Sequence, residues 1–121
     1  MTLVNDLGDL GFTEYEAKVY LALLEDYPAT GYQLSKRAGI PRSMVYEALG
    51  RLDQRGAVMK TEEPKATLYR PMPPSALLYH LVEQHRQRVE AVRPGLEVLY
   101  TARQEGHLWT FEGDTRALSY A

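Results

Sequence analysis

The sequence predicts a mainly α protein with a small β-hairpin, organised as a winged helix-turn-helix followed by a long coiled-coil dimerisation helix. Three observations lead to this fold class. Helix-capping signatures stand at Thr13 and Thr30. A Gly-Ile-Pro turn at residues 39 to 41 separates two helical segments. From residue 75 to 100, apolar side chains recur at alternating spacings of four and three, which is the heptad pattern of a coiled coil.

The first two helices are predicted within the acidic N-terminal third of the chain. Leucines spaced by four and three residues predict a short amphipathic helix that ends at Gly11. Thr13 and Glu16 form a T-x-x-E capping box, and the apolar run that follows predicts a helix packed between others. Tyr27-Pro28 ends this helix.

The third and fourth helices form the predicted helix-turn-helix. The capping signature recurs at Thr30, before a short helix over residues 31 to 38. Gly39 supplies a left-handed cap, and Pro41 suits the start of the next helix, which runs to about Arg55. Apolar or small residues fall at the positions where the two helices must cross.

The rest of the chain is predicted as a hairpin, a long helix and a short terminal segment. Residues 57 to 61 and 67 to 70 are strand candidates around a polar turn. The long helix starts at Ser75, and Pro94 is expected to kink it rather than end it, because this proline lies opposite the heptad seam. Residues 107 to 112 alternate like a strand, and a short helix is expected after Gly113.

These elements divide the chain into three predicted parts. Residues 1–72 form the winged helix-turn-helix domain, and residues 73–104 form the coiled-coil dimerisation helix. Residues 105–121 are expected to begin a truncated C-terminal domain, since a lone strand would leave its backbone groups unpaired.

Composition limits the possible classes of protein. The chain has 121 residues, 45% of them hydrophobic and 25% charged, which is typical of one folded domain. It has no cysteine, which excludes disulfides and thiolate chemistry. No apolar run reaches the roughly 18 residues of a membrane span, and Asp6 and Asp9 stand where a signal peptide would be positive. We therefore expect a cytoplasmic protein with no membrane partner.

The charges are unevenly distributed along the chain. The net charge is -2, but residues 33 to 65 hold seven basic against four acidic residues, whereas residues 1 to 32 hold one against six. The middle segment is thus the candidate surface for a polyanionic partner.

The outward face of the second helix of the helix-turn-helix suits a major groove. We expect Arg42 to grip guanine through its two-pronged guanidinium, and Ser43 and Tyr46 to contact phosphates. Met44 could lie against a thymine methyl, and Glu47 either accepts from a cytosine amine or points away. The preceding helix and the wing complete the predicted DNA-contacting set, which is Gln33, Lys36, Arg37, Arg42, Ser43, Met44, Tyr46, Glu47, Arg51, Lys60 and Lys65.

The heptad seam of the long helix predicts a homodimer. Its members are Leu78, Val82, His85, Val89, Val92, Leu96 and Leu99. A symmetric partner would bury them, although the helix could instead pack on its own winged domain. Arginines at flanking positions leave the orientation of the coiled coil open.

The histidines do not form a metal site by spacing. His85 on the seam suggests a pH switch or a metal ligand, but a packed polar side chain is the more frequent role. His80 lies five residues away, off the spacing that pairs ligands on one helical face. We predict neither a metal nor a cofactor.

Three separated blocks of sequence form a recognisable pattern, which is LGFTEYEAKVYLALL at residues 10 to 24, PATGYQL at 28 to 34 and GIPRSMVYEAL at 39 to 49. In order and spacing these blocks resemble the TrmB family of transcriptional regulators. The resemblance covers about residues 3 to 75 and implies a winged helix-turn-helix, a dimerising coiled coil and a C-terminal effector domain that often binds sugars. Met44 departs from the family pattern, and residues 108 to 113 are similar to the first effector strand.

The predicted function is a homodimeric, sequence-specific regulator that binds double-stranded DNA at a pseudo-palindromic operator. A small sugar-like effector would act only through the C-terminal domain. The alternative is a winged-helix adaptor that binds protein without touching DNA. An enzyme is not expected, because the sequence has no nucleophile with a base, no phosphate loop and no carboxylate cluster.

Overall fold

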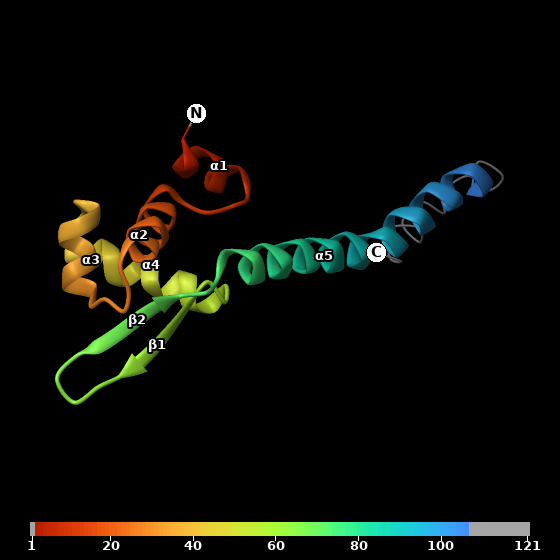
Figure 1. Cartoon of the computed structure of the whole chain (residues 1–121). Coiled ribbons are helices and arrows are strands. Elements are labelled where there is room, and N and C mark those ends of the chain that lie inside the picture. The colour runs from red at the N-terminus through yellow and green to blue at the C-terminus, as the bar shows by residue number, and fades with distance from the viewer. Residues whose placement is uncertain (1, 107–121) are drawn as a thin grey trace. The chain divides into compact units, whose positions relative to one another are not determined.

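A computed structural model describes residues 2 to 106 and confirms the predicted fold class (Figure 1). Its elements are α1 (Leu3–Asp9), α2 (Glu14–Glu25), α3 (Gly31–Ala38), α4 (Arg42–Gln54), β1 (Val58–Glu62), β2 (Thr67–Pro71) and α5 (Pro74–Gly106). The contacts divide the chain into two units, Met1–Leu78 and Tyr79–Ala121. The strand predicted at 107 to 112, the helix after Gly113 and most of the predicted third part, 105–121, lie outside the described residues.

The core of the first unit is formed where α2, α3 and α4 meet. Fully buried aliphatic side chains come from all three helices, and Leu77 adds one from the first turn of α5. α2 is buried on several sides, as its apolar sequence predicts, since it contacts α1, α3, α4 and β2. The largest fully buried aliphatic side chains of these three helices are Val19, Leu23, Leu34, Val45, Leu49 and Leu52.

Local signals set the helix boundaries as predicted. Both capping boxes are formed, with Thr13 and Thr30 each accepting from the backbone three residues later. Gly39 caps α3 in the left-handed region at φ 71°, which disfavours a side chain. The Ser35 hydroxyl donates to the Ile40 carbonyl at 2.6 Å, so this residue also fixes the turn that leads to α4.

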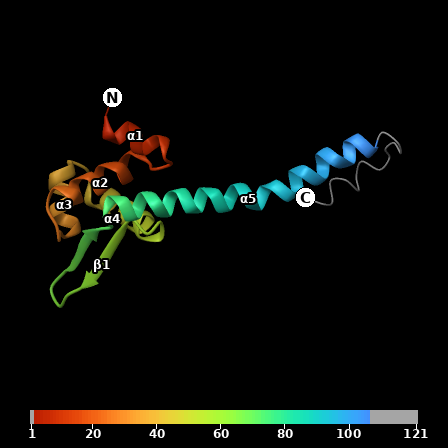
Figure 2. The same cartoon turned by 45° about the vertical axis from the view of Figure 1, so that its right-hand side comes forward.

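The wing is an antiparallel hairpin with one additional contact that the sequence did not indicate. β1 and β2 pair in register from Val58 with Pro71 to Glu62 with Thr67. Ala29, between α2 and α3, forms a bridge with Tyr69 of β2 through backbone bonds of 2.8 and 3.0 Å. The hairpin extends beyond the helices of this unit in both views (Figures 1 and 2).

α5 continues through Pro94 instead of stopping there, as predicted. Its ribbon bends in its C-terminal half in both views (Figures 1 and 2). A proline in a helix removes one backbone hydrogen bond, and its ring clashes with the preceding turn, which accounts for a bend. None of the helices that the structure describes is long and apolar enough to cross a membrane.

The amphipathic pattern of α1 does not produce a buried helix within the described chain. α1 runs only from Leu3 to Asp9 and has no buried residue. Leu3 and Leu10, two of the three leucines that define the pattern, are 64% and 50% exposed.

Tyr20 links α2 to the segment between β2 and α5 and makes the fold sensitive to alkali. Its hydroxyl donates to the Met72 carbonyl at 2.7 Å, and burial raises the pKa of the phenol above its usual value. The folded protein therefore retains this proton to higher pH than the unfolded chain does. We expect the free energy of unfolding to fall as the pH rises above about 10, because the unfolded state then binds fewer protons.

Tyr20→Phe should lower the free energy of unfolding by about 1 kcal/mol at pH 7, because the hydrogen bond is lost. The variant should also lose less stability between pH 9 and pH 11 than the parent, since it lacks this titrating group. Urea unfolding across this range tests both effects. If the variant lost as much stability as the parent between pH 9 and pH 11, other tyrosines would account for the loss. Tyr69 is one such residue, because burial also raises its pKa.

Candidate nucleic-acid interface

α4 buries one face and exposes the other, as a recognition helix must. Val45, Ala48, Leu49 and Leu52 are buried against the rest of the unit. Of the six residues predicted to face outward, Arg42, Ser43, Tyr46 and Glu47 are exposed, whereas Met44 and Arg51 are half-buried. The first two turns of α4 thus present the polar side chains that the sequence singled out.

A cluster of three residues joins the start of α4 to α3, and we call it the Tyr32 cluster. The Tyr32 ring is contacted by Lys36 Nζ, 5.4 Å from the ring centroid, and by the Arg42 guanidinium carbon, 5.2 Å away. Both distances are within the range of cation–π interactions. Tyr32 was not among the residues that the sequence predicted to contact DNA. Its i,i+4 spacing to Lys36 could have indicated the first contact, but not the second.

Two basic residues at the C-terminal end of α4, one of them its C-cap Arg55, face inward onto a buried acid. Arg51 Nε lies 2.6 Å from Glu16 Oε2, and Arg55 Nη1 lies 3.3 Å from Glu16 Oε1. Glu16 is only 2% exposed and also accepts from the Thr13 backbone. Arg55 also stacks on Phe12, with its guanidinium carbon 4.1 Å from the centroid of the Phe12 ring. These cations serve to hold α4 against α2.

Arg37 also serves the fold. Its Nη1 donates to the carbonyl oxygens of Ala22 and Asp26, both at 2.8 Å, near the C-terminal end of α2. A cation there satisfies carbonyls that have no helical partner and favours the helix dipole. Arg37 and Arg51 were both expected at a DNA surface. Because their guanidinium groups have intramolecular partners, we do not carry them into the contact set proposed below.

The remaining residues of the predicted set lie on the surface. Lys36, Arg42, Lys60 and Lys65 are exposed, and the Lys60 ammonium is 4.0 Å from Glu62. Gln33 is exposed too, and its side-chain carbonyl accepts from the Thr30 backbone, which leaves its amide NH2 and one carbonyl lone pair for other partners.

Gly31 determines where the Tyr46 ring lies. A Cβ built on Gly31 would be 2.6 Å from Tyr46 Cζ and 2.8 Å from its hydroxyl oxygen. The missing side chain lets the ring of α4 lie against the first turn of α3. Tyr46 remains 45% exposed there.

The seam residues are mostly exposed in the single chain. Leu78, Val82, Val89, Val92 and Leu96 are exposed aliphatic side chains, His85 is exposed, and Leu99 is half-buried. Two i,i+3 ion pairs lie on the same helix, with Glu83–Arg86 at 2.9 Å and Glu90–Arg93 at 3.1 Å. The hydrogen bond between Glu90 and Arg93, together with their opposite charges, lowers the pKa of Glu90 and raises that of Arg93.

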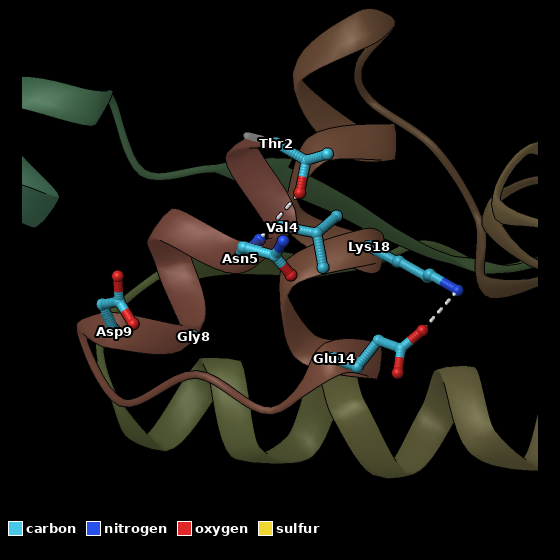
Figure 3. Close-up of a pocket in the computed structure, with 7 residues that line it drawn as sticks. All are labelled: Thr2, Val4, Asn5, Gly8, Asp9, Glu14 and Lys18. Carbon is cyan, nitrogen blue, oxygen red and sulfur yellow. Dashed lines mark hydrogen bonds and ion pairs between the residues drawn. The ribbon is translucent and has the colours of Figure 1, made fainter.

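Two further kinds of site that a chain can carry are a metal site and a ligand pocket. No group of three His, Cys, Asp or Glu side chains that could hold a metal ion occurs among residues 2 to 106. A hollow of about 640 Å³ is lined by residues of α1 and α2 (Figure 3). Two charged residues of its lining, Glu14 and Lys18, form an ion pair with each other, with Lys18 Nζ 2.8 Å from Glu14 Oε2.

Comparison with known proteins identifies the family. The model of the family described as sugar-specific transcriptional regulator TrmB matches residues 7–75. The chain is 35% identical over 119 residues to the uncharacterized protein YrhO of Bacillus subtilis, covering 96% of this chain and 42% of that protein. It is 27% identical to the HTH-type sugar sensing transcriptional regulator TrmBL1 of Pyrococcus furiosus, covering 92% and 33%. The chain thus spans less than half the length of these relatives.

Solved structures agree with this fold. The structure of TrmBL2, described as an archaeal chromatin protein with a novel mode of DNA binding, matches with a TM-score of 0.73 at 27% identity, covering 85% of this chain and 40% of that chain. A possible transcriptional regulator from Methanosarcina mazei has the same fold, with a TM-score of 0.61 at 14% identity, covering 73% and 79%. On the match over residues 7–75, the chain belongs to the TrmB family of winged-helix transcriptional regulators.

Proposed function

We propose that this chain binds double-stranded DNA sequence-specifically as a homodimer, with α4 in the major groove and Arg42 at a base edge. The observation that carries the proposal is the Tyr32 cluster. It places two exposed cations, Lys36 and Arg42, at the exposed start of α4. Neither cation forms an ion pair with any residue between 2 and 106. Such unpaired positive charge suits a polyanion.

The backbone at the same place supports phosphate contacts. Pro41 precedes α4 and gives it no side-chain cap. The first N–H groups of a helix have no intrahelical partner, and a phosphate can accept from them. The hydroxyls of Ser43 and Tyr46 are close in sequence, and the wing adds Lys60 and Lys65 for the adjacent backbone.

The exposed seam supports the proposed dimer. Fully burying an exposed aliphatic side chain contributes about 1.5 to 3 kcal/mol. The exposed seam side chains, which are 43% to 64% exposed, would each gain part of this against a second copy of α5, and together they would stabilise the dimer. Two copies of α4 related by a two-fold axis would then read a pseudo-palindromic operator with half-sites about 34 Å apart or a multiple of it.

The longer relatives suggest regulation by a small molecule. The family description and the name of TrmBL1 both refer to sugars. We propose that a sugar-like effector acts through a C-terminal domain beyond the described residues.

Fluorescence anisotropy with a mixed pool of labelled duplexes tests the DNA proposal. Affinity should fall steeply as salt rises, because each neutralised phosphate releases counterions. Selection from a random duplex library should then recover a two-fold symmetric motif. Absence of salt-sensitive binding would instead favour a winged-helix adaptor that binds protein.

Arg42→Ala should relax preference at one operator base pair by about 1 to 3 kcal/mol, because a bidentate contact to guanine is lost. Competition between operators that differ at single positions measures this effect. Arg86→Ala is the matched control, since it removes the same charge from α5, where Arg86 pairs with Glu83. Equal weakening on every sequence would make Arg42 a phosphate contact.

A further inference from the structure

We infer that Tyr32 is a positioning residue that holds the Arg42 guanidinium for base recognition, and that it therefore helps determine operator specificity. The inference rests on the proposed function. It gives a role to a residue of α3 that was not among the predicted DNA-contacting residues.

The geometry couples two helices through one aromatic ring. Tyr32 is the second residue of α3, and Arg42 is the first residue of α4. The Arg42 guanidinium carbon lies 5.2 Å from the ring centroid, so the arginine is directed by a residue outside its own helix. Glu47, the acid of the outward face, is 3.8 Å from Arg51 and belongs to a different contact.

The ring is not required for the core. Tyr32 is 49% exposed, whereas its neighbours Gly31 and Leu34 are buried. The Tyr32 ring instead contacts two cations that repel each other, Lys36 and Arg42. The negative face of the ring partly offsets this repulsion before any phosphate arrives. Replacing Tyr32 should therefore affect binding of a partner at this surface more than it affects the stability of the fold.

Holding Arg42 in advance should favour specific binding. A free arginine loses considerable rotamer entropy when both prongs of its guanidinium engage a guanine. A contact that already restricts the side chain reduces this loss only for complexes in which Arg42 takes the preset position. Non-specific binding through phosphates gains less from it.

The test compares Tyr32→Leu with Tyr32→Phe. Leucine retains apolar bulk and removes the ring, while phenylalanine retains the ring and removes the hydroxyl. We expect Tyr32→Leu to reduce discrimination at the base pair read by Arg42 by about 2- to 5-fold, the range for an exposed cation–π contact. Tyr32→Phe should restore the parent discrimination. The slope of affinity against salt should stay the same in both variants.

A double-mutant cycle with Arg42→Ala separates positioning from a direct contact. In the Arg42→Ala background, Tyr32→Leu should cause no further loss of discrimination, because the group that Tyr32 positions is absent. Thermal melting of each variant controls for folding, and we expect little change in the midpoint.

The possible failures are distinguishable. A parent protein without salt-sensitive DNA binding would overturn the proposed function and this inference together. Salt-sensitive, selective binding in which Tyr32→Leu keeps full discrimination would overturn the inference alone. Equal losses in Tyr32→Phe and Tyr32→Leu would also overturn it, because the hydroxyl and not the ring would then be responsible.

Discussion

Glu16→Gln should lower the free energy of unfolding by about 1.5 to 3 kcal/mol, the range for a hydrogen bond to a charged group in a protected site. The substitution keeps the size of the side chain and its capability as the third residue of a capping box. It removes the one carboxylate that Arg51 and Arg55 share, at 2.6 and 3.3 Å. Among residues 2 to 106, Arg55 would then lack an ion-pair partner, and Arg51 would keep only the more distant Glu47, at 3.8 Å. Chemical denaturation at pH 7 measures the loss.

Glu14→Gln is the matched control for this substitution. Glu14 is also in the first turn of α2, but its partner Lys18 is on the surface, and their side chains are 67% and 37% exposed. An exposed i,i+4 pair contributes only about 0.2 to 0.5 kcal/mol. Equal losses for the two variants would show that the Glu16 network adds nothing beyond an ordinary surface pair.

Val89→Lys combined with Leu96→Lys should convert the protein to a monomer and weaken operator binding by about 10²- to 10⁴-fold. The loss arises because two linked recognition helices bind the second half-site at high effective concentration. Both positions are exposed on the seam, and a two-fold axis would bring the added charges together beside Arg88 and Arg93. Analytical ultracentrifugation measures the dimer, and anisotropy with full and half operators measures binding.

The control adds the same charges to the opposite side of α5. Gln87→Lys with Ala91→Lys changes exposed residues at outer heptad positions and should leave the dimer intact. A seam variant that stays dimeric would place the interface elsewhere. A monomeric parent would favour packing of α5 on its own winged domain.

The sequence determined the elements and their ends. The two capping boxes, the left-handed Gly39 and the Pro41 start were all visible as residue types at fixed short spacings. Each of these signals acts between residues no more than four apart, so no knowledge of the fold is needed to find it. The heptad spacing likewise indicated one long helix and its exposed apolar face, and α5 is that helix.

Only the tertiary structure decided what each basic residue does. Counting charges placed seven basic residues in residues 33 to 65, without distinguishing those that bind a partner from those that hold the fold. Arg37, Arg51 and Arg55 find acceptors 11 to 44 residues away in the sequence, on or beside α2. Tyr32 meets Arg42 only because the turn brings two helices together. A long charged side chain can reach several partners, so its role depends on which of them the packed helices bring within hydrogen-bonding distance.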